Sequence, residues 1–448
     1  MPPNRARDKP GGPPRAGWSA IVTDCGRIFC HLLAPRMRRS QTAVIAALLV
    51  AYGSFYLCRA NVDAALPFLA REGHDKTSLG LLSSVATGTY AIGKIVLGAT
   101  GDALGGRRLM LLAVAGSVVC SVAFGASHVL ASFVVLAAAN RFFQSGGWPG
   151  LVHTVSRRFE PARHGLIMGV LSTSYELGNV CALLLCGLVA HWGWRALFVV
   201  NPLLFAVIGG AAVLSLPSAT SDAALPTAGE AAPPEPRESL ARVLPHLLAS
   251  RAFWTAVALS ALLTFIRIGF LTWTPTFLSE ISLAHGGGIP GAIVKSALFP
   301  AAGVIAAPCF GVLSDRLGPG RRAPLMAASL AVVVALVVAL ALGVVQEPLA
   351  AAMLIAAIGL FLLGPYSLPA GAIALDVAGK RGPATAAGII DGAGYIGATA
   401  SGSLLGYVAD RAGWSAAFYV VAAAALLAAL VSGGWALASA ARAPATRS

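Results

Sequence analysis

Apolar runs of about 20 residues recur along the whole chain and limit its fold more than any other feature. A helix of that length spans the hydrocarbon core of a bilayer. The 448-residue chain is 57% hydrophobic and 11% charged, whereas soluble domains carry about 25% charged residues. The sequence therefore predicts an all-α membrane protein. The runs predict twelve transmembrane helices at 41–70, 77–99, 108–127, 130–156, 165–190, 194–216, 252–280, 288–313, 322–344, 348–376, 383–408 and 415–440.

The net charge of +14 indicates topology rather than nucleic-acid binding. Arginines gather in the N-terminal tail, in alternate connections between the apolar runs and at the C-terminus, whereas the connections near residues 127, 285 and 347 carry few positive charges. Positive residues mark the cytoplasmic side of a membrane protein. We therefore expect a multi-pass protein of the cell inner membrane, with both termini cytoplasmic. The bilayer is an expected partner and nucleic acid is not.

Residues 217–250 interrupt the apolar rhythm. Their density of Pro, Ala and Glu is typical of a flexible linker. The interruption separates six predicted helices from six more. The predicted domains are a basic cytoplasmic tail at 1–40, an N-terminal six-helix bundle at 41–216, a cytoplasmic linker at 217–250, a C-terminal six-helix bundle at 251–440 and a C-terminal tail at 441–448.

One loop pattern occurs in both halves of the chain. The stretches are GATGDALGGRR at 98–108 and GVLSDRLGPGRR at 311–322. Each places an aspartate at a helix end, then glycines for a tight turn, then an arginine pair, so ion pairs at the cytoplasmic side are expected. The pattern resembles the loop signature of the major facilitator superfamily, whose two pseudo-symmetric six-helix bundles enclose a midplane site and rock about it. The predicted gating residues are Asp102, Arg107, Arg108, Asp315 and Arg316.

Arg59 and Arg267 lie inside predicted transmembrane helices, where an unpartnered charge costs several kcal/mol. Arg59 shares one helical face with Tyr52, Tyr56 and Asp63, at spacings of four, three and four residues. Arg267 occupies the corresponding place in the seventh helix. Guanidinium groups bind phosphate oxygens bidentately and keep their charge. The two arginines therefore predict a central anion site.

Other polar side chains inside the spans extend this site. The remaining candidate substrate contacts are Lys94, Tyr90, Tyr175 and Tyr395, and the candidate coupling or counter-charges are Asp63, Glu176, Asp391 and Arg141. The carboxylates are candidate counter-ions first, with proton carriage and substrate contact as alternatives. A purely structural interpretation pairs Arg59 with Asp63 and Arg141 with Glu176. Arg267 has no acid within a turn or two on its own helix, so it most needs a ligand.

Six segments resemble the organophosphate:phosphate antiporters of the major facilitator superfamily. They are YLCRANVDAALPFL (56–69), YAIGKIVLG (90–98), QSGGWPG (144–150), FIRIGFLTWTPTFL (265–278), GPYSL (364–368) and GIIDGAGYIGA (388–398). The family binds phosphate between an arginine of its first helix and one of its seventh, which implies Arg59 and Arg267. Its tyrosines and lysine near the site match Tyr52, Tyr56, Tyr90, Lys94 and Tyr395.

The chain departs from the bacterial glycerol-3-phosphate type at four positions. Ala60 stands where that type has lysine, and Tyr175 stands where it has histidine. Thr272 and the region of Pro300 stand where it has acids. The arginine pair is kept while the surrounding charges differ, so the organic moiety and the coupling to inorganic phosphate are open.

These observations predict a secondary transporter of the exchange type. The expected substrate is an organic phosphate, such as a sugar phosphate, a glycerol phosphate or a phosphonate-like anion, exchanged for inorganic phosphate by alternating access. The alternatives are a proton-coupled symporter of an organic carboxylate and a non-transporting membrane receptor for a sugar phosphate. No metal spacing or Walker-type loop occurs in the sequence, so no cofactor and no enzymatic activity are expected. A monomer is expected.

Overall fold

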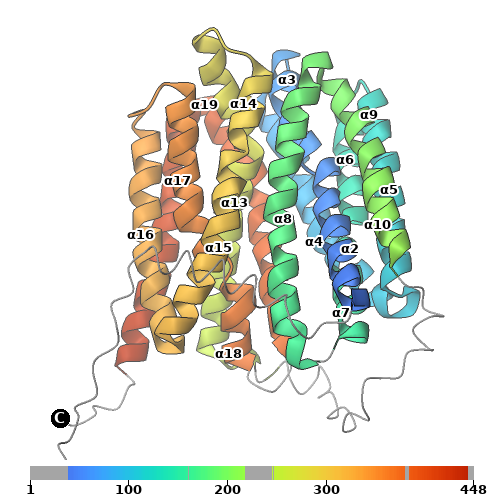
Figure 1. Ribbon diagram of the computed structural model, residues 1–448. Coiled ribbons are helices and arrows are strands. Elements are labelled where there is room, and N and C mark those ends of the chain that lie inside the picture. The colour runs from blue at the N-terminus through green and yellow to red at the C-terminus, as the bar shows by residue number, and fades with distance from the viewer. Residues whose placement is uncertain (1–38, 160, 217–244, 246, 379–382, 442–448) are drawn as a thin grey trace, which may run out of the picture.

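The computed structural model describes residues 39–159, 161–216, 245, 247–378 and 383–441. Within these residues every regular element is helical, and the helices run roughly parallel to one long axis (Figure 1). The predicted N-terminal tail, most of the predicted linker and nearly all of the C-terminal tail lie outside the described residues. The domain boundaries set there remain a prediction.

The first half of the described chain makes six passes along the long axis. The passes are α2 (Arg39–Ser54), η1 (Phe55–Cys58) and α3 (Ala60–Arg71); α4 (Lys76–Leu104); α5 (Gly106–Ala126); α6 (Leu130–Gln144) and α7 (Gly147–Arg158); α8 (Pro161–Val189) with η2 (Ala190–Trp192); and α9 (Trp194–Leu204), η3 (Phe205–Gly209) and α10 (Gly210–Ser215).

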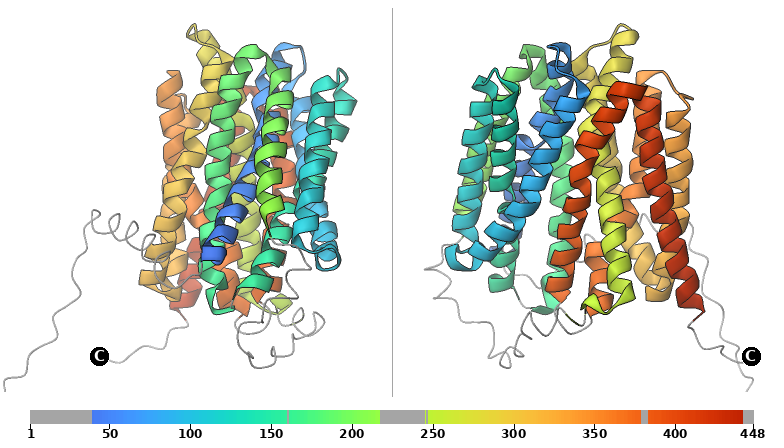
Figure 2. Two further views of the ribbon diagram at one scale, coloured as in Figure 1. Left: turned by 45° about the vertical axis from the view of Figure 1, so that its right-hand side comes forward. Right: turned by 180° about the vertical axis from the view of Figure 1, so that it is seen from behind.

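The second half of the described chain makes six more passes. The elements are α13 (Arg251–Ala284); α14 (Ile289–Ser296) and α15 (Leu298–Leu317); η4 (Pro319–Arg321) and α16 (Arg322–Ala341); α17 (Pro348–Tyr366), η5 (Pro369–Ile373) and α18 (Ala374–Ala378); and α19 (Pro383–Ala440). Gly413 has φ 79° and ψ 174° within α19. At this point the chain reverses, so α19 makes two antiparallel passes (Figure 2, right).

Hydropathy supports the predicted number of transmembrane helices. Ten helices of the described chain are long and apolar enough to cross a membrane, and one of them, Ala386–Ser439, is the stretch that reverses at Gly413. The consecutive short helices α6 and α7 make one further pass. The twelve predicted helices are thus confirmed, with ends displaced by only a few residues.

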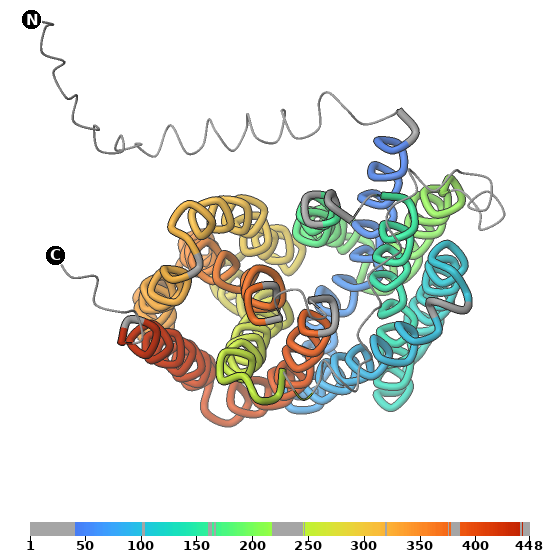
Figure 3. Tube along the Cα trace, turned by 90° about the horizontal axis from the view of Figure 1, so that it is seen from below, coloured from blue at the N-terminus to red at the C-terminus, as the bar shows by residue number. Residues whose placement is uncertain are grey.

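The twelve passes form two groups. Seen along the long axis, the helices of the first half lie on one side and those of the second half on the other (Figure 3). Where the groups meet, α4 packs against α19, α3 against α13, and α8 against α14 and α15. The predicted fold class, two six-helix bundles, is confirmed. The groups are called the first bundle and the second bundle below.

One glycine pair sets how closely the bundles approach. A Cβ added to Gly80 of α4 would lie 2.4 Å from the carbonyl oxygen of Gly402 in α19, and one added to Gly402 would lie 2.6 Å from the carbonyl oxygen of Gly80. Small residues of this kind allow helix backbones to pack in direct contact. Next to them, the Ser403 N–H donates to the Ser84 Oγ at 2.7 Å. The two bundles are therefore in contact along α4 and α19.

Polar contacts join the bundles at the end opposite to the termini, called the far side here. Lys76 at the start of α4 pairs with Glu280 near the end of α13, with 2.9 Å between Nζ and Oε1. Trp414 donates its Nε1–H to Glu280 Oε2 at 2.7 Å, and Thr77 donates to Asp410 Oδ2 at 3.0 Å. These five residues, the far-side cluster, link the bundles at that end.

Candidate functional site

Arg59 lies at a break in the first helical pass. Residues 55–58 form a 3₁₀ turn, and Arg59 follows with φ −104° and ψ −50°. Because a 3₁₀ turn has 3.0 residues per turn rather than 3.6, the helix after it is rotated relative to an uninterrupted α-helix. The predicted common face of Tyr52, Tyr56, Arg59 and Asp63 is therefore twisted at this break.

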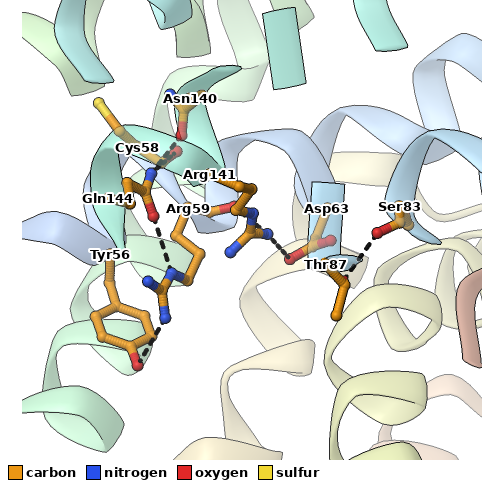
Figure 4. Close-up of polar contacts among 9 residues, drawn as sticks. All are labelled: Tyr56, Cys58, Arg59, Asp63, Ser83, Thr87, Asn140, Arg141 and Gln144. Carbon is orange, nitrogen blue, oxygen red and sulfur yellow. Dashed lines mark hydrogen bonds and ion pairs between the residues drawn. The ribbon is translucent and has the colours of Figure 1, made fainter. Parts of the chain in front are cut away.

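The Arg59 guanidinium is held by uncharged groups (Figure 4). Its Nε donates to Gln144 Oε1 at 2.9 Å, and its Nη1 donates to the Tyr56 hydroxyl at 3.3 Å. The guanidinium also lies over the Tyr56 ring at 4.8 Å and over the Tyr90 ring at 4.6 Å. Among the described residues, no carboxylate lies within ion-pair distance of Arg59. Its charge is therefore available to an anion.

The side chain of Gln144 is held in place by hydrogen bonds other than the one to Arg59. Its Nε2 donates to the carbonyl of Cys58 at 2.8 Å and also to Asn140 Oδ1. Asn140 in turn donates to Ser121 Oγ at 2.8 Å. These bonds leave Gln144 Oε1 pointing at Arg59 (Figure 4). The sequence interpretation assigned no role to Gln144 or Asn140, although two amides four residues apart in an apolar helix are a signal of a buried polar network.

Asp63 forms an ion pair with Arg141 rather than with Arg59. Its Oδ2 lies 3.7 Å from Arg141 Nη2, and the same Nη2 is 3.4 Å from the carbonyl oxygen of Arg59. The expected pairing of Arg59 with Asp63 is therefore wrong. The 3₁₀ turn before Arg59 accounts for this, because it turns Asp63 toward α6 and away from the face that Arg59 occupies.

Arg267 is paired across the bundle interface. Its Nε and Nη2 donate to Oε1 of Glu176 at 3.2 and 2.9 Å. The guanidinium lies between the rings of Tyr175, at 5.5 Å, and Tyr366, at 4.9 Å. Both ion-pair partners are buried, with side chains 3% and 4% exposed.

The pairing of Glu176 with Arg141 is therefore wrong. The expectation that Arg267 most needs a ligand is also wrong, because the carboxylate of Glu176 reaches it from another helix. Glu176 projects from α8, which packs against α14 and α15 of the second bundle. Gly303 in α15 makes room for it, because a Cβ there would lie 3.1 Å from the Glu176 Cδ. Helix-to-helix packing of this kind is invisible in the spacing of residues along one helix.

A second ion pair joins the bundles beside two tyrosines. Lys94 of α4 donates to Asp391 of α19. The Tyr90 and Tyr395 rings are 4.8 Å apart, and Lys94 Nζ lies 4.4 Å from the Tyr395 ring centroid. These four residues join α4 to α19, so the contact between the bundles extends from the far side to this level.

One cavity brings the two arginines together. Its empty space is about 610 Å³, including the part that opens to solvent. The lining residues are Tyr56, Arg59, Val62, Asp63, Ser83, Ala86, Thr87, Tyr90, Arg141, Asn179, Arg267, Ile268, Leu271, Thr272 and Tyr395.

Five of the candidate residues are not in this lining. Lys94 pairs with Asp391 next to the rings of Tyr90 and Tyr395. Arg267 is contacted by the Tyr175 ring and by the Glu176 carboxylate. Tyr52 is buried, with its ring 5.1 Å from the Trp148 ring. Tyr52 thus has a packing role here, and the other four support residues that do line the cavity.

Ion pairs are described at one of the two predicted gating loops. In the second half, Asp315 Oδ1 pairs with Nη2 of Arg322 at 3.2 Å, and Arg322 also binds Asp376. Arg322 is the second arginine of the GRR motif and was missed in favour of Arg316, which is exposed. In the first half, Asp102 lies in the last turn of α4, and Arg107 and Arg108 begin α5. The side chain of Asp102 lies outside the described part of the structure.

Twelve helical passes in two bundles, with buried charges around a central cavity, define a membrane transporter of the alternating-access type. A sequence model of the Major Facilitator Superfamily matches residues 48–402 and 296–448. The chain belongs to this superfamily. It is a multi-pass membrane protein.

Individual relatives are more specific. The chain is 26% identical to the glycerol-3-phosphate transporter of Bacillus subtilis, over 87% of this chain and 91% of the relative. It is 26% identical to a probable hexose phosphate transport protein of Chlamydia pneumoniae, over 86% and 89%. It is 25% identical to the membrane sensor protein UhpC of Escherichia coli, over 88% and 92%. The resemblance to the organophosphate:phosphate antiporter type is confirmed.

Solved structures show the same fold. A bacterial homologue of the human lysosomal transporter Spinster, in an inward-facing and unoccupied conformation, has a TM-score of 0.76 at 15% identity and matches 90% of this chain and 98% of its own. The nucleoside transporter NupG, as the D323A mutant, has a TM-score of 0.67 at 14% identity, over 87% and 99%. At these identities the likeness concerns the fold.

Proposed function

We propose that the protein moves an organic phosphate across the membrane, in exchange for inorganic phosphate. The observation that carries this proposal is that Arg59 and Arg267, from opposite bundles, line one cavity. A phosphoryl group has enough oxygens to accept hydrogen bonds from both guanidinium groups. The relatives include a glycerol-3-phosphate transporter and a probable hexose phosphate transport protein, which supports a phosphorylated small molecule as the substrate.

The charges around the cavity favour an anion. The cations are Arg59, Lys94, Arg141 and Arg267, and the carboxylates are Asp63, Glu176 and Asp391. Each carboxylate is paired with a cation other than Arg59. The net charge of these seven residues is therefore +1, and it is centred on Arg59. Inorganic phosphate carries the same phosphoryl group as the organic substrate, which makes it the natural counter-substrate. Transport of this kind needs no chemical conversion of the substrate.

The orientation follows from the charges of the connections. With positive residues on the cytoplasmic side, both termini lie in the cytoplasm and the far-side cluster faces away from it. The structure, whose bundles are joined at the far side, then corresponds to a carrier closed to the outside of an inner membrane. One chain contains both bundles and the whole cavity, so a monomer suffices for transport.

Two other functions have a specific observation in their favour. A proton-coupled symporter of organic carboxylates is favoured by the three carboxylates around the cavity, which are candidate proton carriers. A non-transporting receptor is favoured by the likeness to the membrane sensor protein UhpC. Both would still use the arginine pair to bind an anion, so binding alone does not separate them from the exchanger.

The test uses purified protein in liposomes loaded with phosphate. Labelled external phosphate should accumulate, and external glycerol 3-phosphate or a hexose 6-phosphate should inhibit this uptake. Uptake of organic carboxylates with no effect of phosphate would support the symporter instead. Phosphate binding in detergent without any flux in liposomes would support the receptor.

A further inference from the structure

Resting on the proposed function, we propose that Glu176 is a tethered anion that occupies Arg267 when no substrate is bound. Its replacement by substrate allows net transport of the substrate together with one proton. Exchange for internal phosphate is then one mode of the carrier rather than a requirement.

The first step is the geometry of the ion pair. Nε and Nη2 of Arg267 form one edge of the guanidinium, and both donate to Oε1 of Glu176. This edge is one of the two with which arginine binds a phosphoryl group bidentately. A substrate that binds this edge competes with Glu176 for the same donors and must displace the carboxylate.

The groups around Glu176 decide the state of its carboxylate after the substrate has displaced it from Arg267. Its Oε2 is buried without a hydrogen-bond partner among the described residues, and Oε1 is bonded only to Arg267. The other titratable groups against it are the hydroxyls of Tyr175 on its own helix and Tyr56 of η1, while α15 presents Gly303. The Tyr366 ring of α17 lies 4.9 Å from the Arg267 guanidinium carbon.

Among the described residues, Arg267 is the only cation paired with Glu176, so no second cation holds the displaced carboxylate. A buried carboxylate without a cation is costly, and taking up a proton removes that cost. The proton binds Glu176 as the substrate binds Arg267. It leaves when the substrate leaves on the other side and the ion pair forms again, so one proton moves with each anion.

The net charge of the empty carrier's site also depends on Glu176. With Glu176 on Arg267, the empty site carries one positive excess, and it would carry two without that carboxylate. Without the carboxylate, two unpaired arginines would line one closing cavity, and their mutual repulsion would oppose the movement of the bundles through a closed state. The tethered anion therefore allows the empty carrier to return, which net transport requires and strict exchange does not.

The test is Glu176→Gln. Glutamine keeps the size of the side chain beside Gly303 and one oxygen that accepts from Arg267, but it has no charge and binds no proton. Labelled phosphate uptake is measured in phosphate-loaded liposomes and in phosphate-free liposomes with an acidic outside. A pH dye inside the liposomes follows the protons. Glu347→Gln, the same change at the exposed start of α17, is the matched control.

Wild type and Glu347→Gln should take up phosphate under both conditions, with acidification of the lumen during net uptake. In Glu176→Gln, the ratio of net uptake to exchange should be at least about tenfold lower than in wild type. Net uptake by Glu176→Gln at the wild-type rate would overturn the proposal, as would a wild type that strictly needs internal phosphate.

The proton measurement on wild type needs no variant. During net phosphate uptake by wild type, each phosphate should bring in one proton more than the phosphate itself carries. Net uptake without this additional proton would contradict the role of Glu176. Absence of phosphate flux in wild type under both conditions would instead contradict the proposed function. The two failures are therefore distinguishable.

Discussion

Arg59 and Arg267 stand in different electrostatic surroundings, although both are proposed to bind one phosphoryl group. Arg59 is held by the neutral Gln144 and by two tyrosine rings, whereas Arg267 is neutralised by Glu176. An incoming anion therefore meets an available charge at Arg59 first. To bind the Nε–Nη2 edge of Arg267, it must displace a carboxylate.

Gln144→Glu tests the importance of this neutral partner. The change keeps the shape of the side chain and places a carboxylate 2.9 Å from Arg59 Nε. The new ion pair would cancel the positive excess of the site, so the affinity for phosphate in the exchange assay should fall at least about tenfold. Gln346→Glu, at an exposed position near the start of α17, should leave it unchanged. Equal affinities in wild type and Gln144→Glu would contradict the neutral-partner account.

At the residue scale the sequence predicted the charged side chains but not their partners. Arg59 and Arg267 could be identified because ionisable residues in apolar runs need a reason to be there. The pairings Asp63–Arg141 and Glu176–Arg267 depend on the turn at 55–58 and on the helix that faces α8. Neither can be read from spacing along a single helix.

At the scale of elements, the long helices follow from apolar length, and their interruptions do not. The 3₁₀ turn η1 precedes Arg59, α6 ends directly before the Ser145–Gly146 break, and η5 contains Gly371 with φ −103° and ψ −107°. Prolines and glycines near two of these sites indicate possible breaks. The hydrophobic runs continue across them, so apolar length alone predicts one helix over each break.

Helix α4 begins with a side-chain cap. Asp75 Oδ1 accepts from the N–H of Ser78 at 2.6 Å, and these bonds lower the pKa of Asp75. A lowered pKa means that the carboxylate stabilises the fold fully above its unfolded pKa of about 4 and loses this effect as the pH falls through the folded pKa. The cap therefore stabilises α4 at neutral pH.

Asp75→Ala should lower the stability of the purified protein by about 1 kcal/mol at pH 7. The difference from wild type should shrink as the pH falls toward 3, because wild type then loses its carboxylate. Thermal unfolding in detergent at several pH values measures both effects. Asp75→Ser, which keeps an acceptor for the helix N–H, should be close to wild type. A serine variant as unstable as the alanine variant would contradict the cap.

At the scale of the whole molecule, the contacts recorded at the two ends differ in kind. Lys76 of the first bundle pairs with Glu280 of the second at the far side, and its Nζ lies 5.0 Å from the ring centroid of Trp414. Arg322, at the terminal side, binds Asp315 and Asp376, which belong to its own bundle. Far-side contacts must break if that side is to open, whereas contacts within a bundle can persist while the bundle moves as a unit.

A cross-link between positions 77 and 410 should therefore stop transport. Thr77 and Asp410 are hydrogen-bonded across the bundles at 3.0 Å. In a background without the seven native cysteines, Thr77→Cys with Asp410→Cys should lose phosphate exchange after treatment with a short thiol cross-linker. Each single variant, treated in the same way, should retain it. Full exchange by completely cross-linked protein would show that the far side need not open.

The central claim is that a phosphoryl group binds between arginines of opposite bundles, and Arg267→Lys in phosphate-loaded liposomes tests it most directly. Lysine keeps the charge and can still pair with Glu176, but it lacks the planar donors of arginine. The claim predicts that labelled phosphate exchange falls below about one hundredth of wild type. Arg195→Lys, at a half-exposed position on the far side, should exchange normally. Wild-type exchange by correctly folded Arg267→Lys would contradict the two-arginine site.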